Sequence, residues 1–282
     1  MPTEMEAYLF DLRGYLMLEN AVDAEHVKEM NAILDTYTDL ETNEWRGWVR
    51  RSGTNPTRHL HQLFEMGEPF ERLIDHPSWI DHMNRFVGGD DGLFIDESFG
   101  DIRTKSAATK LHSGAHKRRI RTQYRYHNNE FRCGQINILL ALTDVGPGDG
   151  GTMVVPGSHK SNLIHPAFAD GAAGKKSMED VEGAIEVNFK AGDALFFVDC
   201  CAHGSAERVT DGERRILIIR YGPHWGGDRY GLMPSPELIS RLTPERRKIV
   251  QPLPPITPPD HPSPYDGLPA SAGAKVMKNR KE

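Results

Sequence analysis

The chain has 282 residues, of which 38% are hydrophobic and 26% are charged, and its formal net charge is −6. This length and composition fit one large soluble domain with a sizeable core. The negative charge balance argues against general nucleic-acid binding, and no window approaches the roughly 18 consecutive apolar residues of a membrane span. The sequence shows no signal-peptide pattern. Three cysteines, two of them adjacent, do not form a disulfide framework, so a reducing cytoplasm is expected.

The first hundred residues are expected to pack as helices around one side of a sheet. A short strand is predicted around residues 15–18, and an amphipathic helix is predicted to start after Asp23, a good N-cap. Residues 38–60 are polar and irregular, which favours a surface loop. The other elements expected here are helices at about 60–74 and 77–87 and a strand at 92–99.

From residue 110 onward, one strand pattern follows another. Asn128-Asn129 between two short strand patterns predicts a tight hairpin turn. The expected strands are 123–126, 131–133, 135–142, 152–155, 184–189, 194–198 and 216–221. With the earlier strand signals they suffice for a closed barrel or double-sheet jelly roll, so a mainly β fold with flanking helices is expected. One domain is predicted over 1–250, including a helix at 235–248, followed by a proline-rich tail over 251–282.

The stretch from Gly192 to Arg214 has the most specific pattern in the chain. A Gly192-Asp193 turn signal precedes the apolar, aromatic run 194–198, which is typical of a buried strand. That strand leads to His203-Gly204-Ser205 and, after a charged turn, to Arg214 at the start of the next strand. An imidazole can hold a transition metal, and a guanidinium can bind a carboxylate through two hydrogen bonds. We expect the two strands to pair and to bring His203 and Arg214 into one cavity.

These residues resemble the phytanoyl-CoA dioxygenase family of iron(II)- and 2-oxoglutarate-dependent oxygenases. Gly14-Tyr15-Leu16-Met17-Leu18 and Pro156-Gly157-Ser158-His159-Lys160 are similar to other blocks of that family, so the likeness covers most of the chain. The resemblance implies a double-stranded β-helix that binds Fe(II), 2-oxoglutarate and O2. By position, His203 would be an iron ligand, Arg214 would bind the distal carboxylate of 2-oxoglutarate, and Ser205 would lie beside it. In that family the histidine at the position of His159 is a structural turn residue.

The other half of the iron site departs from the family pattern. The family carries its second histidine in a His-x-Asp or His-x-Glu motif, and this sequence contains neither. His112 matches the position of that histidine, with Gly114 where the carboxylate would stand. The alternative is His127, with Glu130 three residues later, although its place beside the Asn-Asn turn suggests a hairpin residue. We prefer His112.

Three interpretations of Gly114 remain open. A glycine at the carboxylate position resembles the iron halogenases of the wider oxygenase group, in which chloride or bromide takes the vacant position. Alternatively, a remote side chain such as Glu130 or His116 completes the site, and the reaction is hydroxylation of a C–H bond. In the third interpretation, the chain is a noncatalytic small-ligand binding module on the same barrel.

Several other residues bear on the cosubstrate and substrate. Asn137 or Gln135, on the strand 135–142, could hydrogen-bond the metal-proximal end of the cosubstrate. Cys200 and Cys201 are expected to fill space. A basic cluster near His112 offers either an anchor for an anionic small-molecule substrate or a solvated hairpin: Lys117, Arg118, Arg119, Arg121 and Arg125. No pattern indicates the substrate's identity or the oligomeric state.

Overall fold

The computed structural model describes residues 1–89, 92–112, 122–171, 177–224, 240, 242–243 and 258–261. The chain divides into two compact units, Met1–Gly226 and Gly227–Glu282. Few residues of the second unit are described. The predicted domain boundary at 250 and most residues of the expected 235–248 helix and proline-rich tail lie outside the described residues. No helix in the described ranges is long and apolar enough to cross a membrane.

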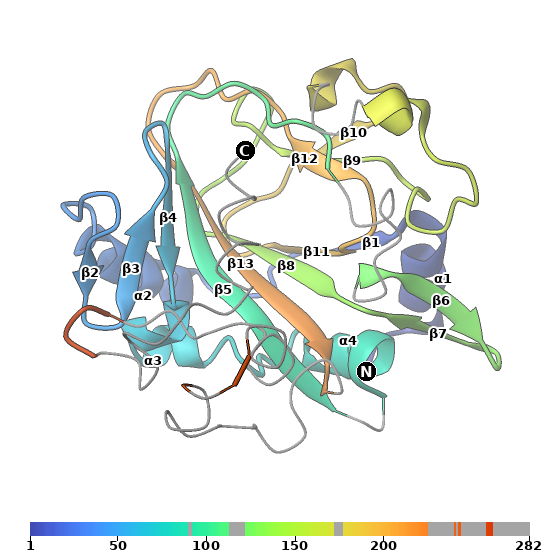
Figure 1. Cartoon of the computed structure of the whole chain (residues 1–282), viewed down its shortest axis with the longest axis horizontal. Coiled ribbons are helices and arrows are strands. Elements are labelled where there is room, and N and C mark those ends of the chain that lie inside the picture. The colour runs from blue at the N-terminus through green and yellow to red at the C-terminus, as the bar shows by residue number, and fades with distance from the viewer. Residues whose placement is uncertain are drawn as a thin grey trace. The chain divides into compact units, whose positions relative to one another are not determined.

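An eight-stranded antiparallel sheet forms the larger layer of the first unit, in the order β1-β11-β8-β13-β5-β4-β3-β2 (Figure 1). Its strands are β1 (Tyr15–Leu18), β2 (Trp45–Arg46), β3 (Val49–Ser52), β4 (Thr57–His61), β5 (Leu93–Arg103), β8 (Ile136–Ala141), β11 (Ala194–Val198) and β13 (Arg214–Pro223). The expectation that β11 and β13 pair directly is wrong. Strand β8 lies between them and is hydrogen-bonded to both, and all six of its residues are buried, as expected for a strand at the centre of the sheet.

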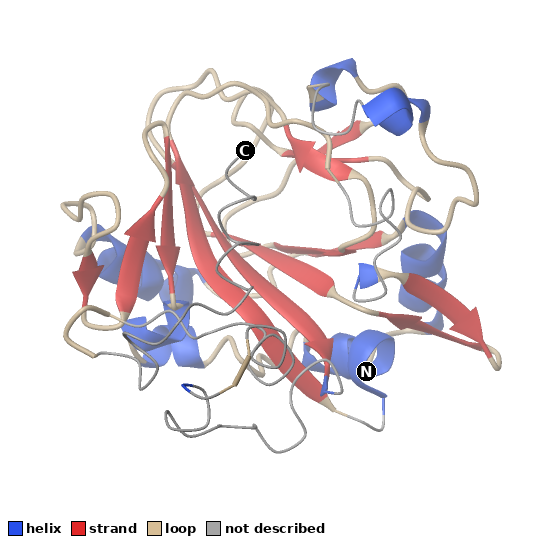
Figure 2. Cartoon of the chain, viewed as in Figure 1, coloured by secondary structure: helices blue, strands red, loops and turns tan. Residues whose placement is uncertain are grey.

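A three-stranded antiparallel sheet, β10-β9-β12, forms the smaller layer. Its strands are β9 (Thr152–Val154), β10 (Ile185–Val187) and β12 (His203–Ser205). The predicted hairpin is also present, as β6 (Tyr124–His127) and β7 (Glu130–Cys133). Asn128 and Asn129 have φ of 53° and 62°, as a two-residue hairpin turn of this kind requires. The two antiparallel layers confirm the predicted mainly β, double-sheet fold (Figure 2).

Short helices flank the sheets. They are α1 (Glu4–Arg13), α2 (Ala24–Asp35), α3 (Glu68–Glu71), α4 (Ile80–Met83), the 3₁₀ helices η1 (Leu63–Met66), η6 (Pro166–Gly171) and η7 (Met178–Asp180), and the π-helix η2 (Asn84–Gly88). Asp23 caps α2 as predicted, since its carboxylate accepts from the His26 N–H at 2.9 Å. Helix α1 was not anticipated from the sequence. It starts at a capping box between Thr3 and Glu6, a local signal that identifies a helix start.

Two expectations for the N-terminal half are wrong. Residues 38–60 contain β2, β3 and the start of β4, which extend the large sheet past β5. In β3 the buried residues alternate, with Val49 and Arg51 facing inward, and this short alternation was hidden among polar residues. The two expected helices at 60–74 and 77–87 are broken into shorter turns. Gln62 and Gly67 interrupt the first, because both have positive φ, 66° and 114°.

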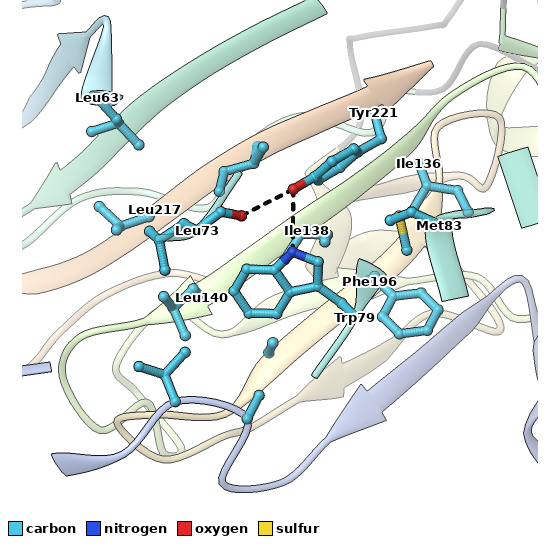
Figure 3. Packing of buried hydrophobic residues seen from close by; sticks show 14 of the residues in the cluster. Leu63, Leu73, Trp79, Met83, Ile136, Ile138, Leu140, Phe196, Leu217 and Tyr221 are labelled. Carbon is cyan, nitrogen blue, oxygen red and sulfur yellow. Dashed lines mark hydrogen bonds between the residues drawn. The ribbon is translucent and has the colours of Figure 1, made fainter. Parts of the chain in front are cut away.

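The core lies between the large sheet and the helices that cover one of its faces (Figure 3). Trp79 Nε1 donates to the Tyr221 hydroxyl at 3.2 Å, and that hydroxyl donates to the Ile74 carbonyl at 2.8 Å. Side chains alternate between the two faces of a strand. On β8, Ile136 and Ile138 therefore pack into this core, while Asn137, which lies between them, faces the opposite side of the sheet.

Candidate active site

A cavity of about 170 Å³ lies between the two sheets. The large sheet contributes side chains from β4, β5, β8, β11 and β13, and the small sheet contributes residues of β9 and β12. The cavity is smaller than the roughly 300–1,000 Å³ usual for drug-sized ligands, so it suits a ligand smaller than those. Its charged and ionisable wall residues are His59, Asp101, Arg103, Arg214, Arg220 and the pair described next.

His112 and His203 face each other at one end of this cavity. Their backbones form an antiparallel bridge, with His112 N to His203 O at 3.1 Å and His203 N to His112 O at 2.9 Å. Their ring centroids are 4.2 Å apart. Each Nδ1 contacts a backbone carbonyl two residues earlier, Lys110 O at 2.9 Å and Cys201 O at 2.7 Å. A carbonyl only accepts, so each Nδ1 carries the proton and each Nε2 keeps its lone pair.

The two Nε2 atoms suit a transition metal. No described residue hydrogen-bonds either of them. Burial lowers the pKa of His112, and burial together with the neighbouring His112 lowers the pKa of His203 to about 3. Both rings are therefore neutral, which is the form that binds metals. Among the described residues, no three His, Cys, Asp or Glu side chains cluster tightly enough to hold a metal ion. The two Nε2 lone pairs could therefore serve as ligands to a transition metal.

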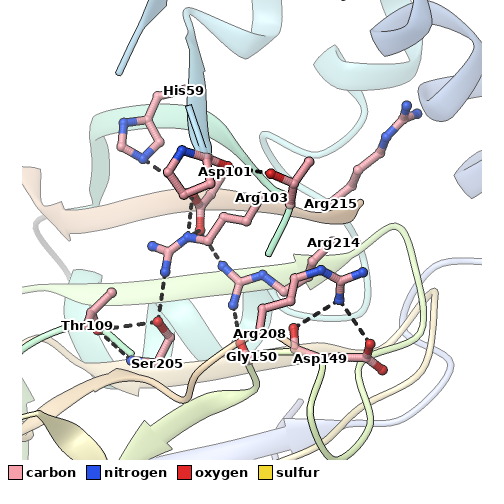
Figure 4. Close-up of polar contacts among 12 residues, drawn as sticks. His59, Asp101, Arg103, Thr109, Asp149, Gly150, Ser205, Arg208, Arg214 and Arg215 are labelled. Carbon is pink, nitrogen blue, oxygen red and sulfur yellow. Dashed lines mark hydrogen bonds and ion pairs between the residues drawn. The ribbon is translucent and has the colours of Figure 1, made fainter. Parts of the chain in front are cut away.

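The opposite end of the cavity is built around Asp101 on β5 (Figure 4). Arg214 Nη2 lies 2.5 Å from Asp101 Oδ2, and Arg103 Nε lies 3.1 Å from Oδ1. His59 Nε2 also approaches Oδ1, at 3.3 Å. Burial alone would raise the pKa of Asp101, but the hydrogen bond from His59 and the two guanidinium charges hold that pKa below its usual range. Asp101 is therefore a carboxylate at neutral pH.

Arg214 and Arg103 give this end of the cavity a net positive charge. Burial lowers the pKa of Arg214 to about 10 against the opposing effect of Asp101, so the guanidinium stays charged at neutral pH. Arg214 also donates to the Gly150 carbonyl, and Arg103 Nη1 donates to the Ser205 hydroxyl at 2.7 Å. Two guanidinium groups share one carboxylate, so one positive charge remains to attract an anion.

The cavity brings together five residues that the sequence singled out. They are His112, Asn137, His203, Ser205 and Arg214. The structure does not bring His127 or Glu130 to His203. Both lie on the β6–β7 hairpin and line a different cavity.

Other residues singled out from the sequence lie outside the described residues or away from the site. Gly114, His116, Lys117, Arg118, Arg119 and Arg121 lie outside the described residues. Arg125 is exposed on the hairpin. Cys200 and Cys201 are buried, and their sulfurs contact backbone carbonyls rather than the cavity, so they fill space as predicted. His159 is also away from the cavity, with Nε2 at 2.9 Å from Asp11 O, in agreement with a structural role.

Asn137 and Gln135 differ in their partners. Gln135 Nε2 donates to Asp96 Oδ2 at 2.8 Å, and Gln135 does not line the cavity. Asn137 does line it, and its Nδ2 donates to Asp199 Oδ1 at 3.0 Å. Asn137 is therefore the one of the two that can reach a bound small molecule.

Sequence reasoning missed the cluster around Asp101. A signal was present, since Phe99, Asp101 and Arg103 alternate along one strand and all three line the cavity. Charged residues on the strand face that is expected to be buried indicate either a β-bulge or a functional site. His59 carries no such signal, because its segment is polar and irregular and its pattern favours a loop.

The double-sheet architecture, with the cavity between the two sheets, is that of a cupin-like jelly-roll protein. Residues 10–216 match the phytanoyl-CoA dioxygenase (PhyH) family model, so the chain belongs to the phytanoyl-CoA dioxygenase family. Members of that family are iron(II)- and 2-oxoglutarate-dependent oxygenases. The match confirms the resemblance seen in the sequence.

Several proteins are similar over most of their length. The dioxygenase cdmD of Talaromyces verruculosus is 22% identical over 263 residues, covering 84% of this chain and 80% of the relative. The ectoine dioxygenase of Bordetella parapertussis is 22% identical, with 86% and 83% covered. The structure of HygX from Streptomyces hygroscopicus with nickel and 2-oxoglutarate bound is 23% identical, with 79% of this chain and 88% of that chain covered and a TM-score of 0.67. The epimerase SnoN from nogalamycin biosynthesis gives a TM-score of 0.57 at 20% identity, with 78% and 82% covered.

Proposed function

We propose that this protein is an iron(II)- and 2-oxoglutarate-dependent oxygenase that hydroxylates a C–H bond of a small molecule. The observation that carries the proposal is one small cavity with His112 and His203 at one end and the Arg103–Arg214 pair at the other. Family membership and the HygX structure with nickel and 2-oxoglutarate bound support the same cofactors. When bound, iron(II) and 2-oxoglutarate supply the oxidation by O2, with release of succinate and CO2.

The chain's own residues divide the work between the two ends. His112 and His203 would hold the metal through Nε2, since their Nδ1 protons are already bonded to backbone carbonyls. Arg214 and Ser205, with Arg103 beside them, would bind the distal carboxylate of 2-oxoglutarate through charge-assisted hydrogen bonds. The apolar walls from Leu139, Ile216 and Ile218 would exclude water from the space between.

Gly114 favours a second candidate reaction. Because glycine offers no side chain where the family carries a carboxylate, chloride could take part, and the product would be a halogenated carbon. The two reactions differ in one measurement. Chloride would shift the visible spectrum of the reconstituted enzyme only if chloride binds the metal.

Uncoupled turnover tests the proposal without knowledge of the substrate. The purified protein is incubated with Fe(II), 2-oxoglutarate and O2, and succinate is measured. We expect succinate from the native protein, and a loss of at least about 100-fold in His203→Ala, because a metal ligand is removed. Succinate formation at the same rate in both proteins, or in neither, would contradict the proposal.

A further inference from the structure

The strand geometry of β11 continues one residue beyond its last residue, Val198, to Asp199. Phe197 lines the cavity, and its ring centroid is 4.6 Å from that of His203. Asp199 follows two residues later. Its backbone N–H donates to Gln135 O at 2.9 Å, which extends the β11–β8 pairing past Val198↔Ile136 by one step. The two-residue alternation of a strand therefore places Asp199 on the same face as Phe197.

Asn137 holds the Asp199 carboxylate on that face. It lies directly opposite Phe197 in the β8–β11 register and lines the cavity. Its Nδ2 donates to Asp199 Oδ1 at 3.0 Å. In the described part of the chain, no other residue hydrogen-bonds the Asp199 side chain. One carboxylate oxygen is therefore fixed, and the other remains available to a ligand.

Among the described residues, Asp199 differs from the other acids near the cavity in having no cation paired with it. Asp101 is bonded to Arg103 and Arg214, and Glu97 pairs with Arg220 at 2.7 Å. Asp199 forms no ion pair with any residue in the described ranges. Its carboxylate instead lies on the strand face that Phe197 presents to His203.

We propose that Asp199 supplies the carboxylate charge of the metal centre, in place of the side chain that Gly114 lacks. This inference rests on the proposed function. Two neutral imidazoles leave the full charge of a divalent ion uncompensated, and a half-buried carboxylate beside them compensates part of it. The described side chains do not form a cluster of three metal ligands. We therefore assign Asp199 as a positioning residue, which does not bind the metal itself and stabilises the bound ion through its negative charge.

Metal affinity, measured apart from turnover, tests the assignment. Co(II) is titrated into the full-length native protein and into Asp199→Asn, Asp199→Ala and Glu130→Gln, with binding followed by calorimetry and by the visible Co(II) spectrum. Asp199→Asn has nearly the same shape and can still accept from Asn137, so its fold is preserved. Glu130→Gln is the matched control, because it removes a carboxylate from the hairpin cavity.

We expect Asp199→Asn and Asp199→Ala to weaken Co(II) binding about 10- to 100-fold, with Glu130→Gln unchanged. Added formate should restore part of the affinity of Asp199→Ala, which a merely structural role would not produce. Native affinity in both Asp199 variants would overturn the inference while leaving the proposed function intact. Failure of the native protein to bind Co(II) would instead overturn the proposed function and the inference together.

Discussion

His112 and His203, 91 positions apart along the chain, are hydrogen-bonded to each other through both backbone N–H groups, at 3.1 and 2.9 Å. This bridge fixes two imidazoles side by side before any metal binds. Each ring is also held by a carbonyl at Nδ1, so little side-chain freedom remains to be lost on binding. The pair is therefore preorganised, which a site on mobile loops would not be.

The arginine end of the cavity predicts a specific loss of cosubstrate binding. Arg214→Lys keeps a positive charge but loses the planar, two-pronged donor geometry. We expect the affinity for 2-oxoglutarate to fall about 10- to 100-fold, measured by calorimetry with Mn(II) present. Arg215→Lys is the control, since Arg215 is on the same strand but bonds Asp35 and Glu213. Equal losses in the two variants would show that Arg214 has no special role.

Gly14 allows the close approach of His159. Its φ is +81°, and a Cβ there would lie 2.4 Å from His159 Nδ1. We expect Gly14→Ala to lower the free energy of unfolding by about 2–4 kcal/mol, from backbone strain plus overpacking. Gly212→Ala separates the two effects, because Gly212 has the same φ of +81° and no heavy atom within 4 Å. Urea denaturation should give a smaller loss for Gly212→Ala, and similar losses would argue against the contact.

His159 predicts a dependence of stability on acid pH. Burial, with a contribution from Lys160, lowers its pKa to about 4 from the ordinary histidine value of about 6.5. In the unfolded chain the imidazole is protonated more readily, so stability from this group is present above about pH 6.5 and is lost as the pH falls toward 4. The difference corresponds to about 3 kcal/mol. The test is urea denaturation of native protein and His159→Gln between pH 7 and 4. The variant should show a shallower decline, and parallel declines would exclude His159 as a cause.

The Tyr221 hydroxyl connects the large sheet to the helical layer. It accepts from Trp79 Nε1 and donates to a backbone carbonyl. Tyr221→Phe leaves the buried Trp79 N–H without this partner, so we expect a loss of about 1–3 kcal/mol in unfolding free energy. Tyr126→Phe is the control, because Tyr126 is 66% exposed. Thermal unfolding of both variants decides the point, and a neutral Tyr221→Phe would contradict this account.

The sequence indicated the strands and site residues with strong local patterns. The β8 and β11 runs, the Asn128-Asn129 turn and the 203–214 motif each carry their signal within a few residues. The sequence left His112 and His127 as alternative partners of His203. The structure distinguishes them, because His112 forms a backbone bridge with His203. Local pattern was sufficient for these elements because burial and turn chemistry act at short range.

The features that escaped sequence reasoning depend on register between distant segments. The place of β8 between β11 and β13, the Asp101 cluster, and the continuation of β11 to Asp199 all follow from pairing that no local window contains. The short strands β2 to β4 were missed because their inward positions include a buried arginine, Arg51. A polar residue at a core position hides the alternation on which strand prediction depends.

The most direct test is anaerobic addition of Fe(II) and 2-oxoglutarate, followed by the visible metal-to-ligand charge-transfer band. It is measured on the native protein, on His112→Ala and on His127→Ala. We predict a band in the native protein and in His127→Ala, and its loss in His112→Ala. A band that survives in His112→Ala but disappears in His127→Ala, or no band in any of the three, would contradict the site described.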